Sequence, residues 1–195
     1  MLNSSIGYLR VEKINQEAAT ALDEEVHKLA REKNVQGLIL DLRGNPGGPP
    51  LAAQEISGFF LNPGEEFAYF QKKGQPKASL DVPVVPEQYR YTGPLVILVD
   101  KGSGSSSELF SGVLQRRKRA VLMGTNTAGQ VMLKSMFNFK DGSMVLLVTS
   151  RGHFPDGNTF SFQGLTPDYY VSKNQEKSIL KAAAFELLKM SANPS

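Results

Sequence analysis

The chain has 195 residues, of which 41% are hydrophobic and 21% are charged, proportions typical of a globular protein with one core. Its 22 basic residues outnumber its 19 acidic ones by three, and their one run, residues 116–119, is too short to indicate nucleic-acid binding. The absence of cysteine excludes disulfides, thiolate nucleophiles and zinc–thiolate sites, and no pattern predicts a cofactor or a metal.

Strands and helices alternate in the first part of the chain. A short strand is expected at 7–11, followed by an amphipathic helix at 16–31, whose apolar residues recur at helical spacing behind a cap at Asn15. Residues 35–42 form a nearly continuous apolar run, which predicts a strand buried on both faces, and this run stops at the loop RGNPGG. A helix at 51–61 follows the loop.

The second part repeats this order of elements. Residues 65–91 alternate short apolar segments with glycine and proline, which favours a surface excursion over core. The run LVILVD at 95–100 predicts a second buried strand, which ends in the small-residue loop KGSGSSS and leads into a helix. The basic run after this helix is interpreted as a solvated helix end. The remaining expected elements are a helix at 108–116, strands at 120–123, 131–139 and 144–149, and a closing helix at 175–190. Together they indicate an α/β layered domain, and no apolar run reaches the roughly 18 residues of a membrane helix.

Two glycine- and serine-rich loops each follow a buried strand and begin a helix. Both therefore present backbone N–H groups at a helix N-terminus, where a developing oxyanion is stabilised. A serine in the second loop would be well placed for covalent catalysis. A flexible connection or a phosphate cradle is the competing interpretation, although the nucleotide-binding pattern GxxxxGK[ST] is absent.

Five segments carry a resemblance to a known family. In order they read GYLRV, LILDLRGNPGG, LVILVDKGSGSSSELFSG, GTNTAGQ and FPDGNTFSFQGLTPD, and they cover residues 7–171. This ordered set is similar to the carboxyl-terminal processing peptidases, also called tail-specific proteases. The resemblance implies a ClpP/crotonase-like layered core of strand-strand-helix units. It places the chain, residues 1–195, in a single protease core domain, with a surface excursion at 65–92 and a C-terminal helix and tail at 172–195.

The same resemblance assigns roles to individual residues. It implies that Ser105 is the nucleophile of a serine endopeptidase that cleaves protein tails or unfolded polypeptides through a Ser/Lys-type acyl-enzyme. It also implies that the backbone N–H groups of Ser106 and Gly47 form the oxyanion hole. Family members are exported, so a bacterial periplasm or a plastid lumen is the expected location. They commonly carry a PDZ domain ahead of the first strand, where this chain has only residues 1–6, so a PDZ-free core is expected.

One position departs from the family pattern. The family's general-base lysine aligns with Gln130, whose amide cannot accept a proton from Ser105, while a lysine, Lys134, stands four residues later. Strand alternation places Lys134 on the same face as Gln130, but about 13 Å further along the strand, and its pKa would have to be lowered by burial. His153, beside the turn FPDG, and His27, on the first helix, are the other candidate bases.

Two functions other than proteolysis stay open at this point. A noncatalytic module on the same fold would bind a peptide or a hydrophobic ligand, with aromatic residues between 137 and 162 lining a groove, although core packing is the commoner role of such residues. A scaffold role would use the segment 65–91 or the C-terminal helix. The expected partner is a polypeptide substrate, with no nucleic acid, and no pattern indicates an oligomeric state.

Overall fold

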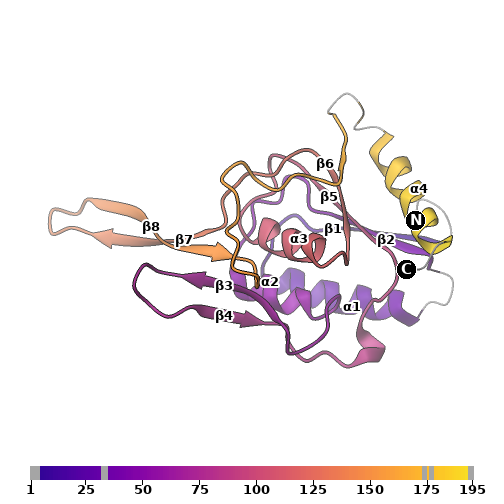
Figure 1. The fold of residues 1–195 in the computed structure, drawn as a ribbon, viewed down its shortest axis with the longest axis horizontal. Coiled ribbons are helices and arrows are strands. Elements are labelled where there is room, and N and C mark those ends of the chain that lie inside the picture. Colours follow the sequence, from indigo (N-terminus) through magenta and orange to yellow (C-terminus); the bar gives the residue numbers. More distant parts are fainter. Residues whose placement is uncertain (1–4, 32–34, 173–174, 176–177, 193–195) are drawn as a thin grey trace.

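A five-stranded parallel sheet forms the centre of the molecule (Figure 1). The computed structural model describes residues 5–31, 35–172, 175 and 178–192. The strand order is β1-β2-β5-β6-β9, and each neighbouring pair is parallel. These strands are β1 (Ile6–Arg10), β2 (Gly37–Asp41), β5 (Leu95–Val99), β6 (Val121–Gly124) and β9 (Tyr169–Tyr170).

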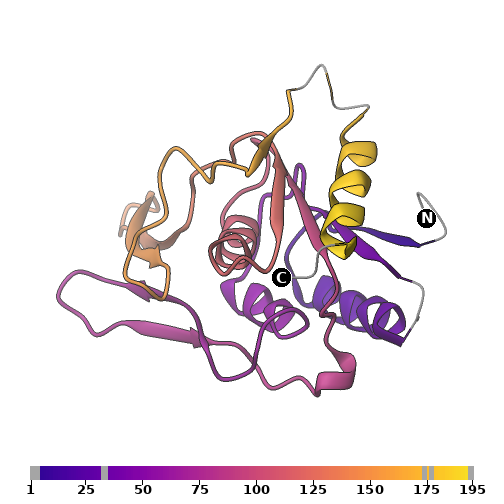
Figure 2. The same cartoon turned by 45° about the vertical axis from the view of Figure 1, so that its right-hand side comes forward.

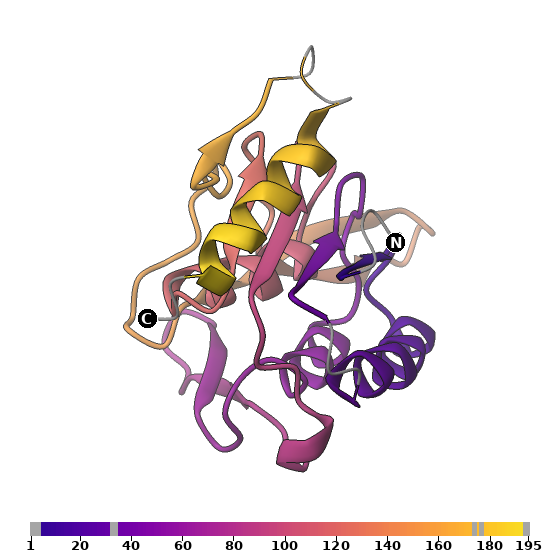
Figure 3. The ribbon, with the colours of Figure 1, turned by 90° about the vertical axis from the view of Figure 1, so that its right-hand side faces the viewer.

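Helices cover both faces of this sheet. The helices α1 (Gln16–Arg31), α2 (Pro50–Ser57) and α3 (Ser106–Arg116) pack on one face, and α4 (Ile179–Ala192) packs on the other (Figure 3). Asn15 caps α1 as expected, because its Oδ1 accepts a hydrogen bond from the Ala18 N–H at 2.8 Å. No helix within the described ranges is long and apolar enough to span a membrane.

The alternation of side chains along the central strands explains their continuous apolar runs. In β2, Leu38 and Leu40 face α1, α2 and α3, whereas Ile39 faces α4. Every residue of β2 and of β5 is buried, so the prediction of two strands buried on both faces is confirmed. This arrangement is typical of parallel sheets covered by helices on both sides.

A second sheet is antiparallel and has the strand order β4-β3-β8-β7. Its strands are β3 (Glu66–Gln71), β4 (Ala78–Asp81), β7 (Met132–Asn138) and β8 (Met144–His153), and a short 3-10 helix, η1 (Glu87–Tyr89), follows β4. Both hairpins of this sheet lie on the side of the molecule away from α4 (Figure 2). The β7–β8 hairpin extends furthest from the body (Figure 1).

The segment 65–92 is not only a surface excursion, as the glycines and prolines had suggested. Phe67, Ala68 and Phe70 of β3 are buried in the larger core cluster, and Val82 and Tyr91 join them. The connection between β3 and β4, most of β4 and the stretch around η1 are largely exposed. The strand β3 pairs with β4 on one side and with β8 on the other, and one of its faces packs on α3. The prolines therefore mark the end of a hairpin that belongs to the core.

The basic run 116–119 is also more than a solvated helix end. Arg116 forms an ion pair with Asp156, and Arg117 forms one with Glu65. Arg119 donates three hydrogen bonds to backbone carbonyls, namely those of Phe60, Tyr91 and Gly93. These contacts attach separate segments of the chain to the C-terminal end of α3, and of the four residues only Arg116 and Lys118 are exposed.

The environment of Tyr91, beside Arg119, predicts that the folded protein loses stability at alkaline pH. Burial raises the pKa of Tyr91 to about 12, above its ordinary value of 10. A pKa that is raised in the folded state gives stability that is complete below pH 10 and is lost as the pH rises toward 12, up to about 3 kcal/mol. We expect Tyr91→Phe to remove this part of the pH dependence in urea unfolding followed between pH 8 and 11.5. Tyr170→Phe, at a position that is 68% exposed, is the matched control and should leave it unchanged.

Candidate active site

Ser105 lies in the loop that joins β5 to α3, directly before the first residue of the helix. Its backbone has φ 52° and ψ −118°, and among the described residues other than glycine only Lys118 also has a positive φ. Such a conformation costs an L-residue about 1–3 kcal/mol and is found preferentially at functional sites. The fold therefore holds a serine at the end of a buried strand in a strained conformation.

The glycine loop after β2 packs against this serine. Gly47 has φ +93°, and a Cβ built on it would lie 2.5 Å from the Gly104 carbonyl oxygen, 2.7 Å from the Ser106 nitrogen and 2.9 Å from Ser105 Cβ. No side chain other than hydrogen fits this space. The sequence motif GNPGG thus permits the two loops to approach each other closely. The position of this motif after a buried strand had suggested such an approach.

Asn45 holds the two loops together. This fully buried side chain donates from Nδ2 to the Val11 carbonyl at 2.7 Å, and its backbone carbonyl accepts the Gly104 N–H at 2.9 Å. Its Oδ1 accepts the Gly47 N–H at 2.9 Å, so one of the two expected oxyanion donors already has an internal acceptor. The pairing of Gly47 with Ser106 as an oxyanion hole stays a prediction.

The buried Glu108 carboxyl group connects the serine loop to the segment that carries Gln130. Its Oε2 accepts the backbone N–H groups of Ser105 at 3.0 Å and of Gln130 at 2.7 Å. Its Oε1 accepts the Gly129 N–H and the Thr127 hydroxyl. Sequence reasoning missed this role, although the spacing Ser-x-x-Glu at the start of a helix is the signature of a capping box and was a usable signal.

We expect Glu108→Gln to destabilise the protein by about 2–4 kcal/mol, because an amide nitrogen would face backbone donors that need an acceptor. Urea unfolding measures this change. The exposed Glu87→Gln is the matched control and should stay within about 0.5 kcal/mol of the parent. A Glu108→Gln protein as stable as the parent would show that the four hydrogen bonds do not hold these segments.

One cavity of about 230 Å³ brings the predicted catalytic residues together. Ser105, Gln130 and Lys134 all line it, so the structure places the nucleophile candidate, the family's lysine position and the displaced lysine around one space. Its walls come from α2, α3, β3 and the start of β7. The other lining residues are Gly48, Pro50, Phe70, Ser106, Leu109, Val131, Met132 and Leu133.

Within this cavity, the backbone of residue 130 lies close to that of Ser105. The Gln130 and Ser105 amide nitrogens bind the same Glu108 oxygen and so lie within about 6 Å of each other. Lys134 follows a shift in strand register between Leu133 and Lys134 and is exposed. Within the described part of the chain, no hydrogen bond joins Lys134 to Ser105, so its role as base is still a prediction.

Neither histidine lines the cavity. His153 stacks on Tyr69 with ring centroids 4.7 Å apart, and its Nδ1 lies 3.3 Å from the Gly157 carbonyl oxygen. His27 lies on α1, where its Nε2 is 3.0 Å from Asp23 Oδ1. The structure therefore gives no support to either histidine as the base.

The aromatic residues between 137 and 162 divide into two groups. Phe154 and Phe160 are buried and stack with centroids 3.9 Å apart, as core packing predicts. Phe137, Phe139 and Phe162 are between 46% and 62% exposed. The expectation of core packing thus holds for only part of the group, and Phe137 and Phe139 lie on the β7–β8 hairpin rather than in a groove.

A charged cluster at the end of β2 fixes the start of the glycine loop. The fully buried Asp41 accepts hydrogen bonds from the Arg43 side chain at 2.6 and 2.9 Å and from the Tyr8 hydroxyl at 2.8 Å. Burial raises the pKa of Asp41, but the hydrogen bonds from Arg43 and Tyr8 outweigh burial and leave this pKa lowered. The carboxylate is thereby kept charged at neutral pH.

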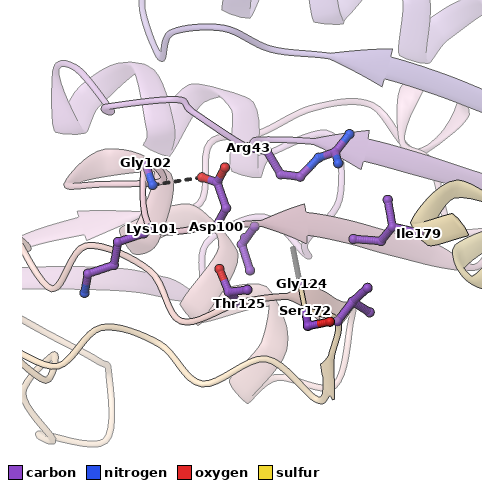
Figure 4. A pocket seen from close by; sticks show the side chains of 10 residues that line it. Arg43, Asp100, Lys101, Gly102, Gly124, Thr125, Ser172 and Ile179 are labelled. Carbon is purple, nitrogen blue, oxygen red and sulfur yellow. Dashed lines mark hydrogen bonds between the residues drawn. The ribbon is translucent and has the colours of Figure 1, made fainter. Parts of the chain in front are cut away.

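A second cavity of about 170 Å³ lies on the α4 side of the same loops (Figure 4). Arg43, Lys101, Thr125 and Ser172 contribute to its wall, and Ser105 does not. Asp100, also in the wall, accepts the backbone N–H groups of Gly44 and Gly102. The candidate nucleophile therefore lies outside this second cavity.

Comparisons with known proteins identify relatives of this chain. The carboxyl-terminal-processing peptidase 2 of Arabidopsis thaliana chloroplasts is 32% identical over 180 residues, which cover 88% of this chain and 33% of that protein. The carboxyl-terminal-processing protease of a Synechocystis strain is 31% identical over 169 residues, which cover 87% of this chain and 38% of that protein. The chain thus spans about a third of the length of these relatives.

A solved structure gives the same fold. The photosystem II D1 C-terminal processing protease superposes with a TM-score of 0.77 at 24% identity, over 94% of this chain and 46% of that one. The expected layered α/β fold is confirmed by this likeness. The family model described as peptidase family S41 matches residues 5–171. The chain belongs to peptidase family S41.

Proposed function

We propose that this chain carries the catalytic site of a serine endopeptidase with Ser105 as its nucleophile. The observation that supports this proposal is the single cavity that joins the strained Ser105 to Gln130 and Lys134. Ser106 is disfavoured as a competing nucleophile, because its hydroxyl donates to the Gly48 carbonyl at 2.6 Å. Its backbone N–H remains the proposed oxyanion donor.

The proposed reaction is acyl transfer in two stages. Ser105 Oγ attacks the carbonyl carbon of a peptide bond, its proton passes to a base, and the carbonyl electron pair moves to an oxyanion held by backbone N–H groups. The C–N bond then breaks as the leaving amine takes up the proton. A water molecule attacks the resulting ester by the same route and releases the acid and Ser105.

The base is the weak component of the site. Gln130 occupies the family's lysine position and cannot take the proton. Lys134 lines the same cavity and is the proposed substitute. It must lose its proton and extend along the cavity to reach Ser105, which predicts slow catalysis in the unmodified chain.

The proposed substrate is an extended polypeptide. Phe70, Leu109, Val131 and Leu133 give the cavity apolar walls suited to side chains of such a substrate. Relatives are named for the processing of carboxyl termini, so protein tails and unfolded chains are the first substrates to test. We propose action in a bacterial exported compartment or a plastid lumen; one relative is named as chloroplastic and another comes from a Synechocystis strain.

Labelling with a serine-reactive fluorophosphonate tests the proposal. The unmodified chain is expected to be labelled, and Ser105→Ala is expected to lose the label. The heat-unfolded chain is the control for nonspecific reaction of other serines. Equal labelling of the parent and Ser105→Ala would contradict the assignment of the nucleophile.

A noncatalytic peptide-binding module is the second candidate function, and Gln130 is the observation that favours it. If the parent chain takes no label but binds unfolded casein in a titration, the cavity binds polypeptide without cleaving it. Cleavage that disappears in Lys134→Ala would instead show that the displaced lysine is the working base.

A further inference from the structure

The β7–β8 hairpin, here called the arm (residues 132–148), exposes an unusual amount of apolar surface. Eight large apolar side chains between its root and its tip are 36% to 64% exposed. They are Leu133, Met136, Phe137, Phe139, Met144, Leu146, Leu147 and Val148. The arm extends away from the body of the molecule, where the described part of the chain offers it little cover (Figure 1).

The exposed residues occupy both faces of the arm. The register pairs Met136 with Leu146 on one face, and Phe137 with Val145 on the other. A hairpin with one apolar face would be explained by packing on a single neighbouring surface. Two apolar faces require an occupant that surrounds the arm.

The outer edge of the arm is free for further strand pairing. The strand β7 is the last strand of its sheet, so half of its backbone N–H and C=O groups lack a neighbouring strand within the described structure. Its seven residues, MLKSMFN, include one charge, one register shift between Leu133 and Lys134, and no proline. Natural edge strands are usually protected by several charges, prolines or bulges, and an apolar edge with few of these devices pairs readily with another strand.

From these observations we propose that two copies of this chain associate through their arms, with β7 of one copy paired antiparallel to β7 of the other. An antiparallel pair of identical strands is self-complementary, as a two-fold dimer requires. The seven residues of β7 span about 24 Å. The tip of each arm then lies beside the root of the other arm, so that the apolar faces of both arms meet the partner's body.

The exposed area fits a second copy. With the roughly 150–250 Å² of an aromatic side chain as an upper value for each, the eight half-exposed residues present at most about 800 Å², summed over both faces of the arm. Each partner contributes about 800 Å² to a standard protein interface. The proposal does not involve Ser105, but it meets the proposed function at the root of the arm, where Leu133 and Lys134 of β7 also line the Ser105 cavity.

Sedimentation velocity from about 1 to 100 µM tests the association. The parent chain is expected to sediment as a dimer that dissociates on dilution. The double variants Phe137→Lys/Leu147→Lys and Met136→Lys/Leu146→Lys change one face each, and both are expected to sediment as monomers. The control is Phe185→Lys on α4, at a position that is 66% exposed, which should leave the dimer intact. Circular dichroism and a thermal melt confirm that each variant is folded.

The strand pairing itself is tested by cross-linking, for which the cysteine-free sequence is convenient. Single cysteines at Lys134, Ser135 and Met136, at the centre of β7, are introduced one at a time. In an antiparallel pair of β7 strands, one of these three residues lies opposite the same residue of the other copy. The two Cα atoms are then about 4.5–5.5 Å apart, which a disulfide can bridge. Ala78→Cys, on the opposite edge strand β4, is the control and should not cross-link.

Three outcomes would overturn the proposal. A parent chain that is monomeric at 100 µM has no self-associating arm. A dimer that survives both double variants uses another surface. A dimer without a cross-link at any of the three central positions is not built on β7 pairing. A chain that is monomeric at 100 µM and binds casein through its arm would overturn the dimer in the same way. It would identify polypeptide as the occupant of the arm.

Discussion

The Gln130→Lys variant is expected to cleave casein at least about 100-fold faster than the unmodified chain. A positioned general base contributes roughly 10²–10⁴-fold to the rate. Glu108 holds the backbone of residue 130 within about 6 Å of the Ser105 backbone, and both side chains line one cavity. A lysine at this position can therefore reach the Ser105 hydroxyl without any rearrangement of the loops.

The pH profile separates a catalytic effect from a structural one. A lysine base acts only when neutral, so the rate of Gln130→Lys should rise with pH until the lysine is deprotonated. Gln130→Met has a side chain of similar length without a basic nitrogen and should remain at the parent rate. A folded Gln130→Lys protein with the parent rate would show that the missing lysine is not what limits this site.

Replacement of Ser105 is expected to abolish cleavage in the parent and in the Gln130→Lys background. Ser105→Ala removes the proposed nucleophile and keeps the strained backbone, and because Ser105 is the N-cap of α3 the free energy of unfolding should fall by about 0.5–2 kcal/mol. Ser105→Gly removes the nucleophile and relieves the strain of a positive φ, so it should stabilise the protein by about 1 kcal/mol. Urea unfolding and casein cleavage measured on the same samples check both expectations.

The two substitutions control for each other. Equal stability of Ser105→Ala and Ser105→Gly would mean that the backbone at this position carries no measurable strain. Cleavage that persists in either variant would mean that another residue is the nucleophile. Ser106→Ala serves as a neighbouring control, because it keeps the proposed oxyanion N–H and loses only the hydroxyl that donates to Gly48.

Local patterns in the sequence were sufficient for most of the secondary structure. The amphipathic period of residues 16–31 and the cap at Asn15 agree with α1, and the apolar runs agree with β2 and β5. The expected closing helix at 175–190 corresponds to α4, which begins at Ile179; residues 173–174 and 176–177 lie outside the described part of the chain. These features depend on neighbouring residues along the chain, so their signals survive in a single sequence.

The family and the location of the nucleophile loop could also be inferred from the sequence by itself. The motifs around Gly47 and Ser105 lie next to buried strands, and the ends of parallel strands meet at one edge of a sheet. The contact between the two loops required by Gly47 agrees with that inference.

Only the tertiary structure decided the features that join distant residues. Arg119 bonds to three carbonyls that lie 26 to 59 residues away, and Glu108 bonds to backbone groups up to 22 residues away. The core position of β3 and the projection of the arm likewise depend on strand pairing between remote segments. Side-chain periodicity reports which face of an element is apolar. It does not report which distant segment will satisfy a buried polar group or leave an apolar face uncovered.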